Sequence, residues 1–329
     1  MTSQIKQATA VAHPNVALIK YWGKRDTDLN IPAVGSLSLT LAGLETRTRI
    51  RFDPGLKADQ VLLDGRSDEN AARRVSRCLD ILREAAGVEH RAEVVSENDF
   101  PTGAGLASSA SGFAALVRAA AAALSIEDMQ LLNDVARIGS GSAPRSLHSG
   151  IVLLDLAAQS HSAIPCHTVC QPEEWPLAAV VAVTSRQKKA VGSTGGMESS
   201  RDTSPFYKGW VDSHPQDLEA GLGAVKARDF QRLAELSESS CLKMHAVAMS
   251  TQPPLVYWTA ATMACMRRVR DLRAAGVPVF FTIDAGPQLK AVCLPEAVSQ
   301  VHAALEDTEG VLDVIDCSLG TGAWAEPNA

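Results

Sequence analysis

The segment over residues 101–116, PTGAGLASSASGFAAL, constrains the fold more than any other part of the sequence. Gly103 and Gly105 permit backbone angles that other residues avoid, and they let a ligand approach the main chain closely. Ser108 and Ser109 can cap the long alanine-rich helix that we predict next. The unpaired N–H groups and the dipole at the start of such a helix favour phosphate. An ordinary glycine-rich turn with a serine cap is the simpler alternative.

Strands and helices alternate along the rest of the chain without the strict rhythm of a parallel sheet, so we predict an α+β fold. A length of 329 residues suits two domains, which we place at 1–180 and 181–329. The residues over 185–205 are rich in Lys, Gly, Ser and Thr and predict a functional loop. The predicted strands are 36–44 and 46–52 (an antiparallel pair), 91–99, 149–157, 177–184, 278–284 and 290–294. The predicted helices are 67–86, 108–124, 126–137, 215–225, 228–247, 257–275 and 296–306.

Composition narrows the class of protein. The net charge of −6 argues against a nucleic-acid-binding protein, which usually has a basic face. Seven cysteines, an odd and scattered set, do not form a disulfide framework, and we expect a reduced, cytoplasmic setting. Cys166 and Cys170 lie near His161 and His167, but their spacing does not fit a closed zinc site. We expect neither a signal peptide nor a membrane span, because no long apolar run occurs.

Four motifs carry a resemblance to a known family. The pattern P-x3-G-L-x-S-S-A within 101–116 resembles the phosphate-binding motif of the GHMP kinase superfamily. Three further motifs resemble those of the diphosphomevalonate decarboxylase family within it: NVALIKYWGKR at 15–25, GSGSAPRSL at 139–147 and TIDAGP at 282–287. With weaker matches at Arg74, at 188–197 and at 244–254, the resemblance covers nearly the whole chain in the same order.

The resemblance implies a GHMP-kinase-like two-domain fold with an active-site cleft between the domains, and a homodimer. It also implies ATP-dependent decarboxylation of mevalonate 5-diphosphate to isopentenyl diphosphate, a step of the mevalonate pathway of isoprenoid and lipid biosynthesis. In that reaction ATP, with Mg²⁺, first phosphorylates the oxygen on C3, and loss of phosphate then drives loss of CO₂.

The residues also support these roles by their own chemistry. The forked guanidinium of Arg145 matches a carboxylate, and by resemblance it holds the substrate C1 carboxylate together with Asn15. Asp284 follows an apolar strand, where a carboxylate is often only a turn former. The resemblance instead makes it the catalytic base for the C3 hydroxyl. Lys188 is the candidate catalytic contact to the ATP phosphates.

The remaining predicted site residues follow from the resemblance. The predicted substrate-binding residues are Tyr21, Lys24, Arg74, Ser140, Gly141, Ser142, Arg145, Ser193, Thr194 and Met197. The predicted ATP-binding residues are Gly103, Ala104, Gly105, Leu106, Ala107, Ser108, Ser109 and Lys188. We expect Mg²⁺ to be held mainly by ATP, with Ser108 as a candidate protein ligand. We expect His148 to be packed or solvent-facing rather than catalytic.

The chain departs from the family pattern in three places, namely Ala-Val-Gly-Ser after Pro32, Pro144 before the arginine, and Gln288 after Ala-Gly-Pro. These departures leave rival functions open: decarboxylation of mevalonate 5-phosphate, a mevalonate 3-kinase, or a silent nucleotide-binding GHMP scaffold. The combination of Tyr21, Lys24 and Arg74 favours a diphosphate, because one phosphate needs fewer cations.

Overall fold

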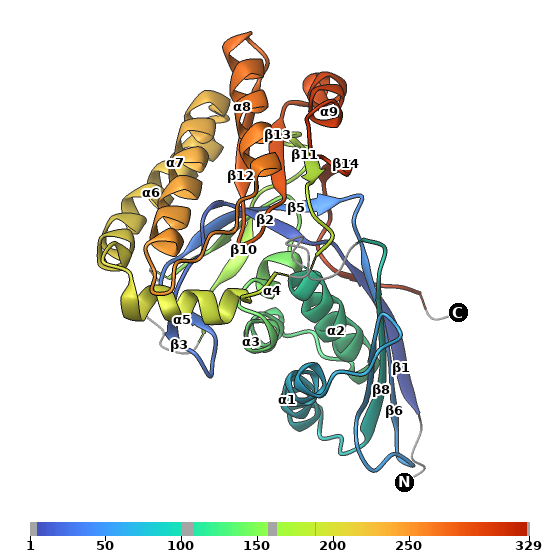
Figure 1. Ribbon diagram of the computed structural model, residues 1–329. Helices are drawn as coiled ribbons and strands as arrows, with labels where there is room; N and C mark the ends of the chain where they lie inside the picture. The colour runs from blue at the N-terminus through green and yellow to red at the C-terminus, as the bar shows by residue number, and fades with distance from the viewer. Residues whose placement is uncertain (1–4, 101–107, 157–162, 188, 328–329) are drawn as a thin grey trace.

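The computed structural model describes residues 5–100, 108–156, 163–187 and 189–327. It has two lobes, each built on a β-sheet with helices packed against it (Figure 1). Helices and strands are mixed, and among the described residues the only parallel strand pair is β7 with β8. The predicted α+β class is therefore confirmed. No helix in the described ranges is long and apolar enough to cross a membrane.

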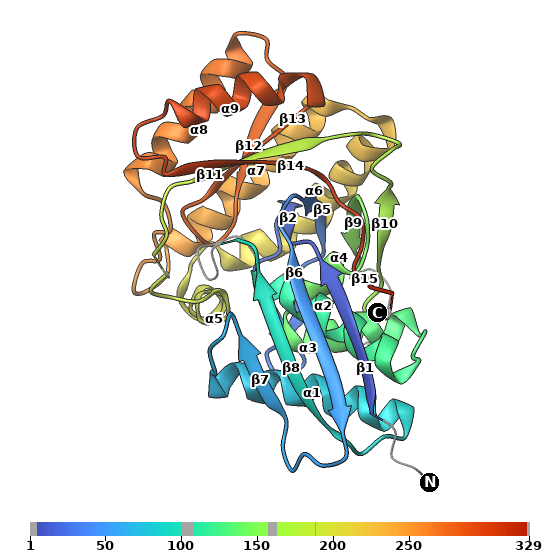
Figure 2. The ribbon, with the colours of Figure 1, turned by 90° about the vertical axis from the view of Figure 1, so that its right-hand side faces the viewer.

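The first lobe contains a five-stranded sheet in the order β15-β1-β6-β8-β7 (Figure 2). Alternation along β6 places Ile50 and Phe52 in the core and Arg47, Arg49 and Arg51 on the outer face. Helix α2 packs on the inner face, where its small side chains allow a close approach, and helices α1 and α3 pack against α2. The elements are β1 Lys6–Ala12, β6 Thr46–Asp53, β7 Gln60–Leu63, α1 Glu69–Ala86, β8 Arg91–Asn98, α2 Ser108–Leu124, α3 Met129–Gly139 and β15 Trp324–Ala325.

The second sheet has eight strands in the order β10-β9-β5-β14-β11-β13-β12, and β2 also pairs with β5. It joins early and late parts of the chain, because β14 lies between β5 and β11. Its strands are β2 Asn15–Ile19, β5 Ser36–Ala42, β9 Ile151–Leu154, β10 Cys166–Cys170, β11 Ala178–Val183, β12 Val279–Ile283, β13 Leu289–Cys293 and β14 Asp313–Leu319. A short pair, β3 Lys24–Asp26 and β4 Ile31–Pro32, lies outside both sheets.

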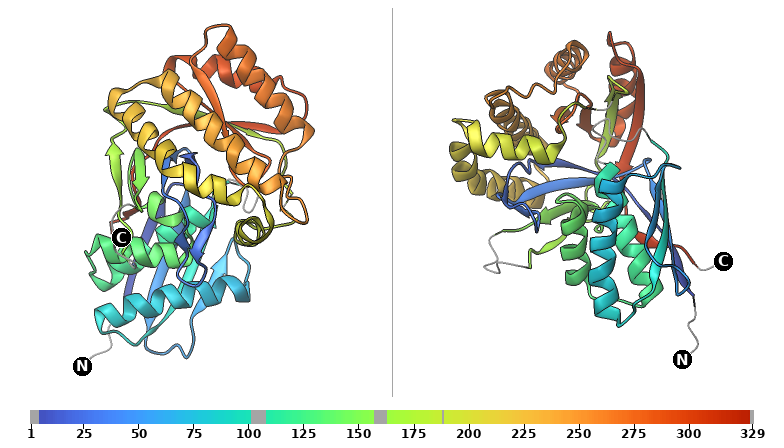
Figure 3. Two further views of the ribbon diagram at one scale, coloured as in Figure 1. Left: turned by 90° about the vertical axis from the view of Figure 1, so that its left-hand side faces the viewer. Right: turned by 60° about the horizontal axis from the view of Figure 1, so that its bottom comes forward.

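Helices cover both faces of the β11–β14 part of this sheet (Figure 3). Helices α6 and α7 pack with Ala179 and Val181, and helices α8 and α9 pack with Val180 and Ala182. Successive residues of β11 thus point to opposite faces of the sheet and belong to two separate hydrophobic cores. These elements are α5 Ser193–Thr203, α6 Tyr207–Ala227, α7 Phe230–Met249, α8 Ala260–Ala274, the 3₁₀ turn Pro295–Ala297 and α9 Val298–Glu306, and the one-turn helix α4 Ala143–Ser146 belongs to the first half of the chain.

Two structural predictions need correction. The strands predicted at 36–44 and 46–52 exist as β5 and β6, but they belong to different sheets and do not pair with each other. The chain turns between them at Gly43, whose φ of +96° suits glycine. The loop predicted at 185–205 contains helix α5, which has little intrinsic helix propensity. Tertiary contacts stabilise it, since Trp22 Nε1 donates to Ser200 Oγ at 2.9 Å and Met197 is buried.

Candidate active site

Arg145 lies on α4 and is held by residues of the first half of the chain. Its Nε donates to Asn15 Oδ1 at 3.1 Å, and its Nη1 donates to Ser36 Oγ at 2.9 Å. Asn15 is fixed in turn, because its amide donates to Ser146 Oγ at 2.7 Å and to the Ser142 carbonyl at 3.1 Å. Burial lowers the pKa of Arg145, yet arginine remains charged. In the described ranges Nη2 has no hydrogen-bond partner, so the guanidinium retains donors for an anion.

Asp284 follows the end of β12 and lies between two buried lysines. The distance from Lys20 Nζ to Asp284 Oδ1 is 2.6 Å, and that from Lys290 Nζ to Asp284 Oδ2 is 3.7 Å. Burial alone would raise the pKa of Asp284, but the charges of Lys20, Lys290 and Arg145 outweigh burial and lower it to about 2. The carboxylate is therefore ionised at neutral pH.

Helices α6 and α7 fix the backbone on both sides of this ion pair. The Lys20 N–H donates to Ser240 Oγ at 3.0 Å, and the Lys20 carbonyl accepts from His214 Nε2 at 2.9 Å. The Ile283 carbonyl, next to Asp284, accepts a hydrogen bond from His245 Nε2 at 3.2 Å. Since Lys20 and Asp284 come from opposite ends of the chain, these contacts hold the two halves of the site together.

The predicted diphosphate ligands form two groups. Arg145 Cζ lies over the Tyr21 ring, 5.5 Å from the ring centroid. The Tyr21 hydroxyl lies close to Gly141. Burial raises the pKa of Tyr21, so the phenol stays protonated. Lys24 Nζ donates to Thr194 Oγ1 at 3.1 Å, which connects β3 to the first turn of α5. Strand β3 and the start of α5, which come from different halves of the chain, therefore meet beside the predicted diphosphate ligands.

Other predicted substrate ligands border the same region. The hydroxyls of Ser140 and Ser142 lie 3.3 Å apart in the turn that precedes Arg145. Arg74 donates from Nε to the Gly139 carbonyl at 3.2 Å and stacks on Phe113 at 4.7 Å. Ser193 and Met197 belong to α5, and the buried Met197 packs in the cluster that contains Tyr21.

The predicted lysine of the 185–205 segment falls outside the described residues, since Lys188 is not described. Its neighbour Lys189 faces the site and donates to Ser193 Oγ and to the Ala285 carbonyl, both at 2.9 Å. Burial lowers the pKa of Lys189, and Asp284 opposes that shift. Lys189 thus adds a cation beside the Asp284 carboxylate.

The structure brings to this region four residues that were not predicted as site residues from the sequence: Lys20, Ser36, Lys189 and Lys290. Lys20 follows the apolar strand β2 and Lys290 lies within the apolar strand β13, and neither has a local feature that points to Asp284. The pairing of β12 with β13 brings Lys290 to Asp284, whereas tertiary packing brings Lys20 there. His148, in contrast, lies where a non-catalytic residue is expected, with Nε2 at 2.9 Å from Asn133 Oδ1 and with burial lowering its pKa to about 4.

A cavity of about 140 Å³ lies beside the start of α2. It is bounded by Ser108, Ser109 and Arg74, and by residues of β6, β7 and β8. The predicted ATP-binding residues Gly103, Ala104, Gly105, Leu106 and Ala107 lie outside the described residues. Ser108 and Ser109 are the predicted ATP-binding residues that the structure describes, and both border this cavity at the N-terminus of α2. This is the arrangement expected for a nucleotide.

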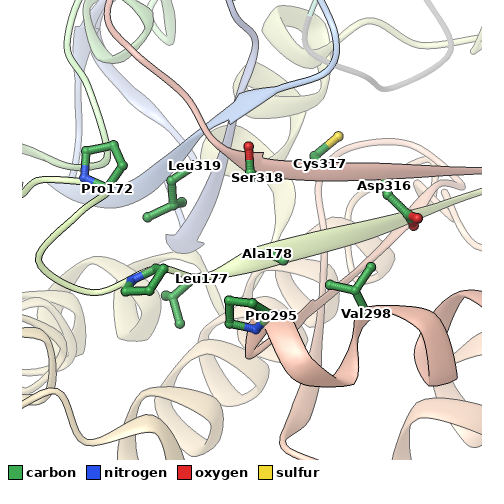
Figure 4. A pocket seen from close by; sticks show the side chains of 10 residues that line it. Pro172, Leu177, Ala178, Pro295, Val298, Asp316, Cys317, Ser318 and Leu319 are labelled. Carbon is green, nitrogen blue, oxygen red and sulfur yellow. The ribbon is translucent and has the colours of Figure 1, made fainter.

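A second hollow of about 430 Å³ lies elsewhere (Figure 4). It is mainly apolar and is bounded by Pro172, Leu177, Pro295 and Val298, with Asp316 at one end (Figure 4). None of the predicted site residues described above borders it. Its lining offers no cation for a phosphate, so it is not the active site.

The α+β fold, the phosphate-type helix start and the ring of cations around one carboxylate define a phosphoryl-transfer protein on a GHMP-type scaffold. Comparison with known sequences agrees over most of the chain. Residues 12–164 match the model of the diphosphomevalonate decarboxylase-like N-terminal domain, and residues 179–319 match that of the mevalonate 5-diphosphate decarboxylase C-terminal domain. The chain belongs to the diphosphomevalonate decarboxylase family.

Individual relatives give the same result. A diphosphomevalonate decarboxylase from Candida albicans is 37% identical over 300 residues, covering 85% of this chain and 82% of the relative. The enzyme of that name from Homo sapiens is 34% identical, covering 90% of this chain and 79% of the relative. The family and enzyme class predicted from the motifs are therefore confirmed.

Solved structures match the fold over the full length. The mevalonate diphosphate decarboxylase of Staphylococcus aureus has a TM-score of 0.92 at 36% identity, covering 99% of this chain and 100% of the other. A structure described as MDDEF in complex with MVAPP, AMPPCP and magnesium has a TM-score of 0.90 at 34% identity, with the same coverage. The GHMP-type fold is confirmed by these matches.

Proposed function

We propose that this chain converts mevalonate 5-diphosphate and ATP into isopentenyl diphosphate, CO₂, ADP and phosphate. The observation that carries the proposal is the pairing of a guanidinium clamp at Arg145 with an ionised carboxylate at Asp284 that is flanked by lysines. Such a site suits a substrate that brings both a carboxylate and a hydroxyl. The names and bound ligands of the related structures support this substrate.

The binding roles follow from charge. Arg145 takes the C1 carboxylate through its free donors, and Asn15 and Ser36 keep its plane fixed. The diphosphate end of the substrate binds to a surface formed by Tyr21, Lys24, Arg74, Ser140, Gly141, Ser142, Ser193, Thr194 and Met197. A diphosphate requires cations, and Lys24 and Arg74 supply them. Burial lowers the pKa of Lys24 and that of Arg74, and the charge of Arg74 lowers the pKa of Lys24 further. A bound anion beside these two cations is therefore favoured.

The first chemical step is phosphoryl transfer to the C3 oxygen. The new bond joins that oxygen to the γ-phosphorus, and the bond from the γ-phosphorus to the bridging oxygen of ADP breaks. The hydroxyl proton passes to Asp284. A carboxylate with a pKa of about 2 is a weak base, so the proton moves late, when the oxygen has become acidic. Before that point Asp284 orients the hydroxyl, and Lys20, Lys189 and Lys188 offset the phosphoryl charge.

The second step uses the phosphate as a leaving group. The C3–O bond breaks with its electron pair on phosphate, and the C1–C2 electron pair forms the C2–C3 double bond as CO₂ departs. Arg145 orients the carboxylate until it leaves as CO₂. The proton taken by Asp284 returns to solvent, which restores the carboxylate.

ATP fits the start of α2 and the adjoining cavity. The glycine-rich segment and Ser108 and Ser109 would hold the phosphates, and the cavity bounded by these serines would take the base. In the described ranges no group of three His, Cys, Asp or Glu side chains could hold a metal ion. This donor set fits an ion held mainly by ATP, with the Ser108 hydroxyl as a candidate ligand. Bound Mg²⁺ would neutralise phosphate charge during the transfer.

Three further expectations belong to this proposal. We expect a homodimer, by resemblance, which light scattering after gel filtration would test. We expect a cytoplasmic location, supported by seven free and buried cysteines. The division into domains at about residue 180 also stays a prediction, which limited proteolysis would test.

The function is tested by incubating the purified protein with ATP, Mg²⁺ and either mevalonate, mevalonate 5-phosphate or mevalonate 5-diphosphate. ADP and CO₂ in equal amounts with the diphosphate alone would support the proposal. Equal amounts with the monophosphate would move the substrate by one phosphate. ADP without CO₂ would identify a 3-kinase, and neither product would indicate a silent nucleotide-binding scaffold.

A further inference from the structure

Lys290 occupies an unusual position for a lysine. It is the second residue of β13, which lies between β11 and β12, and its side chain is 3% exposed. Its neighbours Leu289 and Ala291 are apolar and fully buried. An apolar residue would suit this strand better on packing grounds, since burying an ammonium group is costly unless it is paired.

Strand register brings Lys290 to the catalytic carboxylate. Lys290 pairs with Thr282 across β12 and β13, and Asp284 follows Thr282 by two residues, so all three side chains share one face of the sheet. The measured distance of 3.7 Å from Lys290 Nζ to Asp284 Oδ2 agrees with this register. Lys20 contacts the other oxygen, Oδ1. Each carboxylate oxygen thus has its own lysine.

One carboxylate cannot neutralise all the cations near it. Four basic side chains act electrostatically on Asp284: Lys20, Lys290, Arg145 and Lys189. Among the described residues, two further titratable groups face it, Cys241 and His245, and both lie on α7. Burial raises the pKa of Cys241 to about 11 and lowers that of His245 to about 3, so both are uncharged near pH 7. The surplus of positive charge is available to anionic reactants.

We propose that Lys290 is a positioning residue for the decarboxylase reaction, which holds Oδ2 of Asp284 while Lys20 holds Oδ1. This inference rests on the proposed function. Lys290 is buried behind the carboxylate and acts on the substrate through Asp284. With both oxygens held, the carboxylate keeps one orientation and stays ionised, and a remaining lone pair accepts the C3 hydroxyl hydrogen. The proton balance of phosphoryl transfer is unchanged, because Asp284 remains the acceptor.

Two substitutions separate charge from packing. Lys290→Met replaces the ammonium group with an apolar side chain of similar length, and Lys290→Arg keeps a permanent charge. A matched control is Lys243→Met, because Lys243 also pairs with a carboxylate, that of Asp217 at 2.7 Å, but on the α6–α7 surface outside the site. Thermal unfolding of each variant shows whether it is folded before activity is compared.

We expect Lys290→Met to lower kcat on the order of 10- to 100-fold, with the KM for ATP and for mevalonate 5-diphosphate within about threefold of wild type. The apparent pKa of the acidic limb in the profile of kcat against pH should rise by about one unit, since Asp284 loses one of its neighbouring cations. Lys290→Arg should recover much of kcat and return the limb toward its original position. Lys243→Met should match wild type in both respects.

Wild-type kcat and an unchanged acidic limb in folded Lys290→Met would overturn the proposal. An Arg variant as slow as the Met variant would also overturn it, because charge would then not be the requirement. Carbon-13 NMR titration of the Asp284 carboxyl, assigned with Asp284→Asn, gives a readout that does not depend on turnover. If the wild type releases neither ADP nor CO₂, the proposed function fails. The titration then still decides whether Lys290 sets the ionisation of Asp284.

Discussion

Replacing Gly141 with alanine tests the proposed diphosphate surface by adding a single methyl group. A Cβ on Gly141 would lie 2.4 Å from the Tyr21 hydroxyl oxygen and 3.1 Å from its Cζ. The backbone itself would tolerate alanine, because Gly141 is not among the glycines with positive φ. The steric conflict with Tyr21 is therefore the only new feature of the variant.

The size of the effect follows from these distances. Ordinary van der Waals contact begins near 3.4 Å, so the hydroxyl and the new methyl must separate by about 1 Å. Tyr21 is buried beneath the Arg145 guanidinium and has little room to rotate. A misplacement of about 1 Å in a binding constellation can cost on the order of 100-fold in rate. We expect kcat/KM for mevalonate 5-diphosphate to fall by about that factor, or about 2.7 kcal/mol.

Steady-state release of CO₂ and ADP at varied mevalonate 5-diphosphate measures this loss. The matched control is Gly223→Ala on α6, where no atom lies within 4 Å of the added Cβ. That variant should keep wild-type kinetics and gain about 0.5–1 kcal/mol of stability from improved helix propensity. A folded Gly141→Ala enzyme with wild-type kcat/KM would refute the reasoning, since Tyr21 would then not need its present position.

Three other predictions concern charge and packing. Asp284→Asn should lower kcat by about 10²- to 10⁴-fold. Because the folded pKa of about 2 lies below the ordinary 3.8, the stabilisation from ionised Asp284 is present above pH 3.8 and is lost as pH falls toward 2. Urea denaturation measures the difference in unfolding free energy between wild type and this variant, which should be constant above about pH 5 and change below it. A constant difference down to pH 2 would contradict the depressed pKa of Asp284. Arg145→Gln should lower kcat/KM by about 10²- to 10³-fold with Asn15 and Ser36 left partly unpaired, and kinetics within threefold of wild type would exclude Arg145 as the carboxylate clamp. Ser200→Ala should lower the free energy of unfolding by about 1–3 kcal/mol, because buried Trp22 Nε1 loses its acceptor, and an unchanged denaturation midpoint would show that Trp22 is satisfied otherwise.

The parts of the site that local chemistry marks could be predicted from the sequence. Arg145 lies among serines and glycines, and Asp284 lies between an apolar strand and an Ala-Gly-Pro turn, so each stands out in the linear sequence. The α2 helix was predicted with its observed limits because alanine and the preceding serines define it.

The cations around Asp284 could not be found in this way. Lys290 was read as part of an apolar strand, and only the pairing of β12 with β13 brings it to Asp284. Lys20 similarly meets Asp284 only through tertiary packing. Helix α5 was missed because glycines and serines dominate its sequence, while its stability comes from Trp22 and Tyr257 packed against Gly196. Non-local contacts of this kind leave no periodic signal.

The position of β14 has a consequence for how the protein is made. It is the last strand of the eight-stranded sheet to be synthesised, yet it lies between β5 and β11, not at an edge. Until Leu319 has left the ribosome, β11 presents an open edge and Ala42 and Leu41 lack their partners on β14. Exposed strand edges attract other chains. The nascent polypeptide therefore depends on β14 to close the sheet, and products stalled or terminated before Leu319 should be the species most prone to aggregate in the cell.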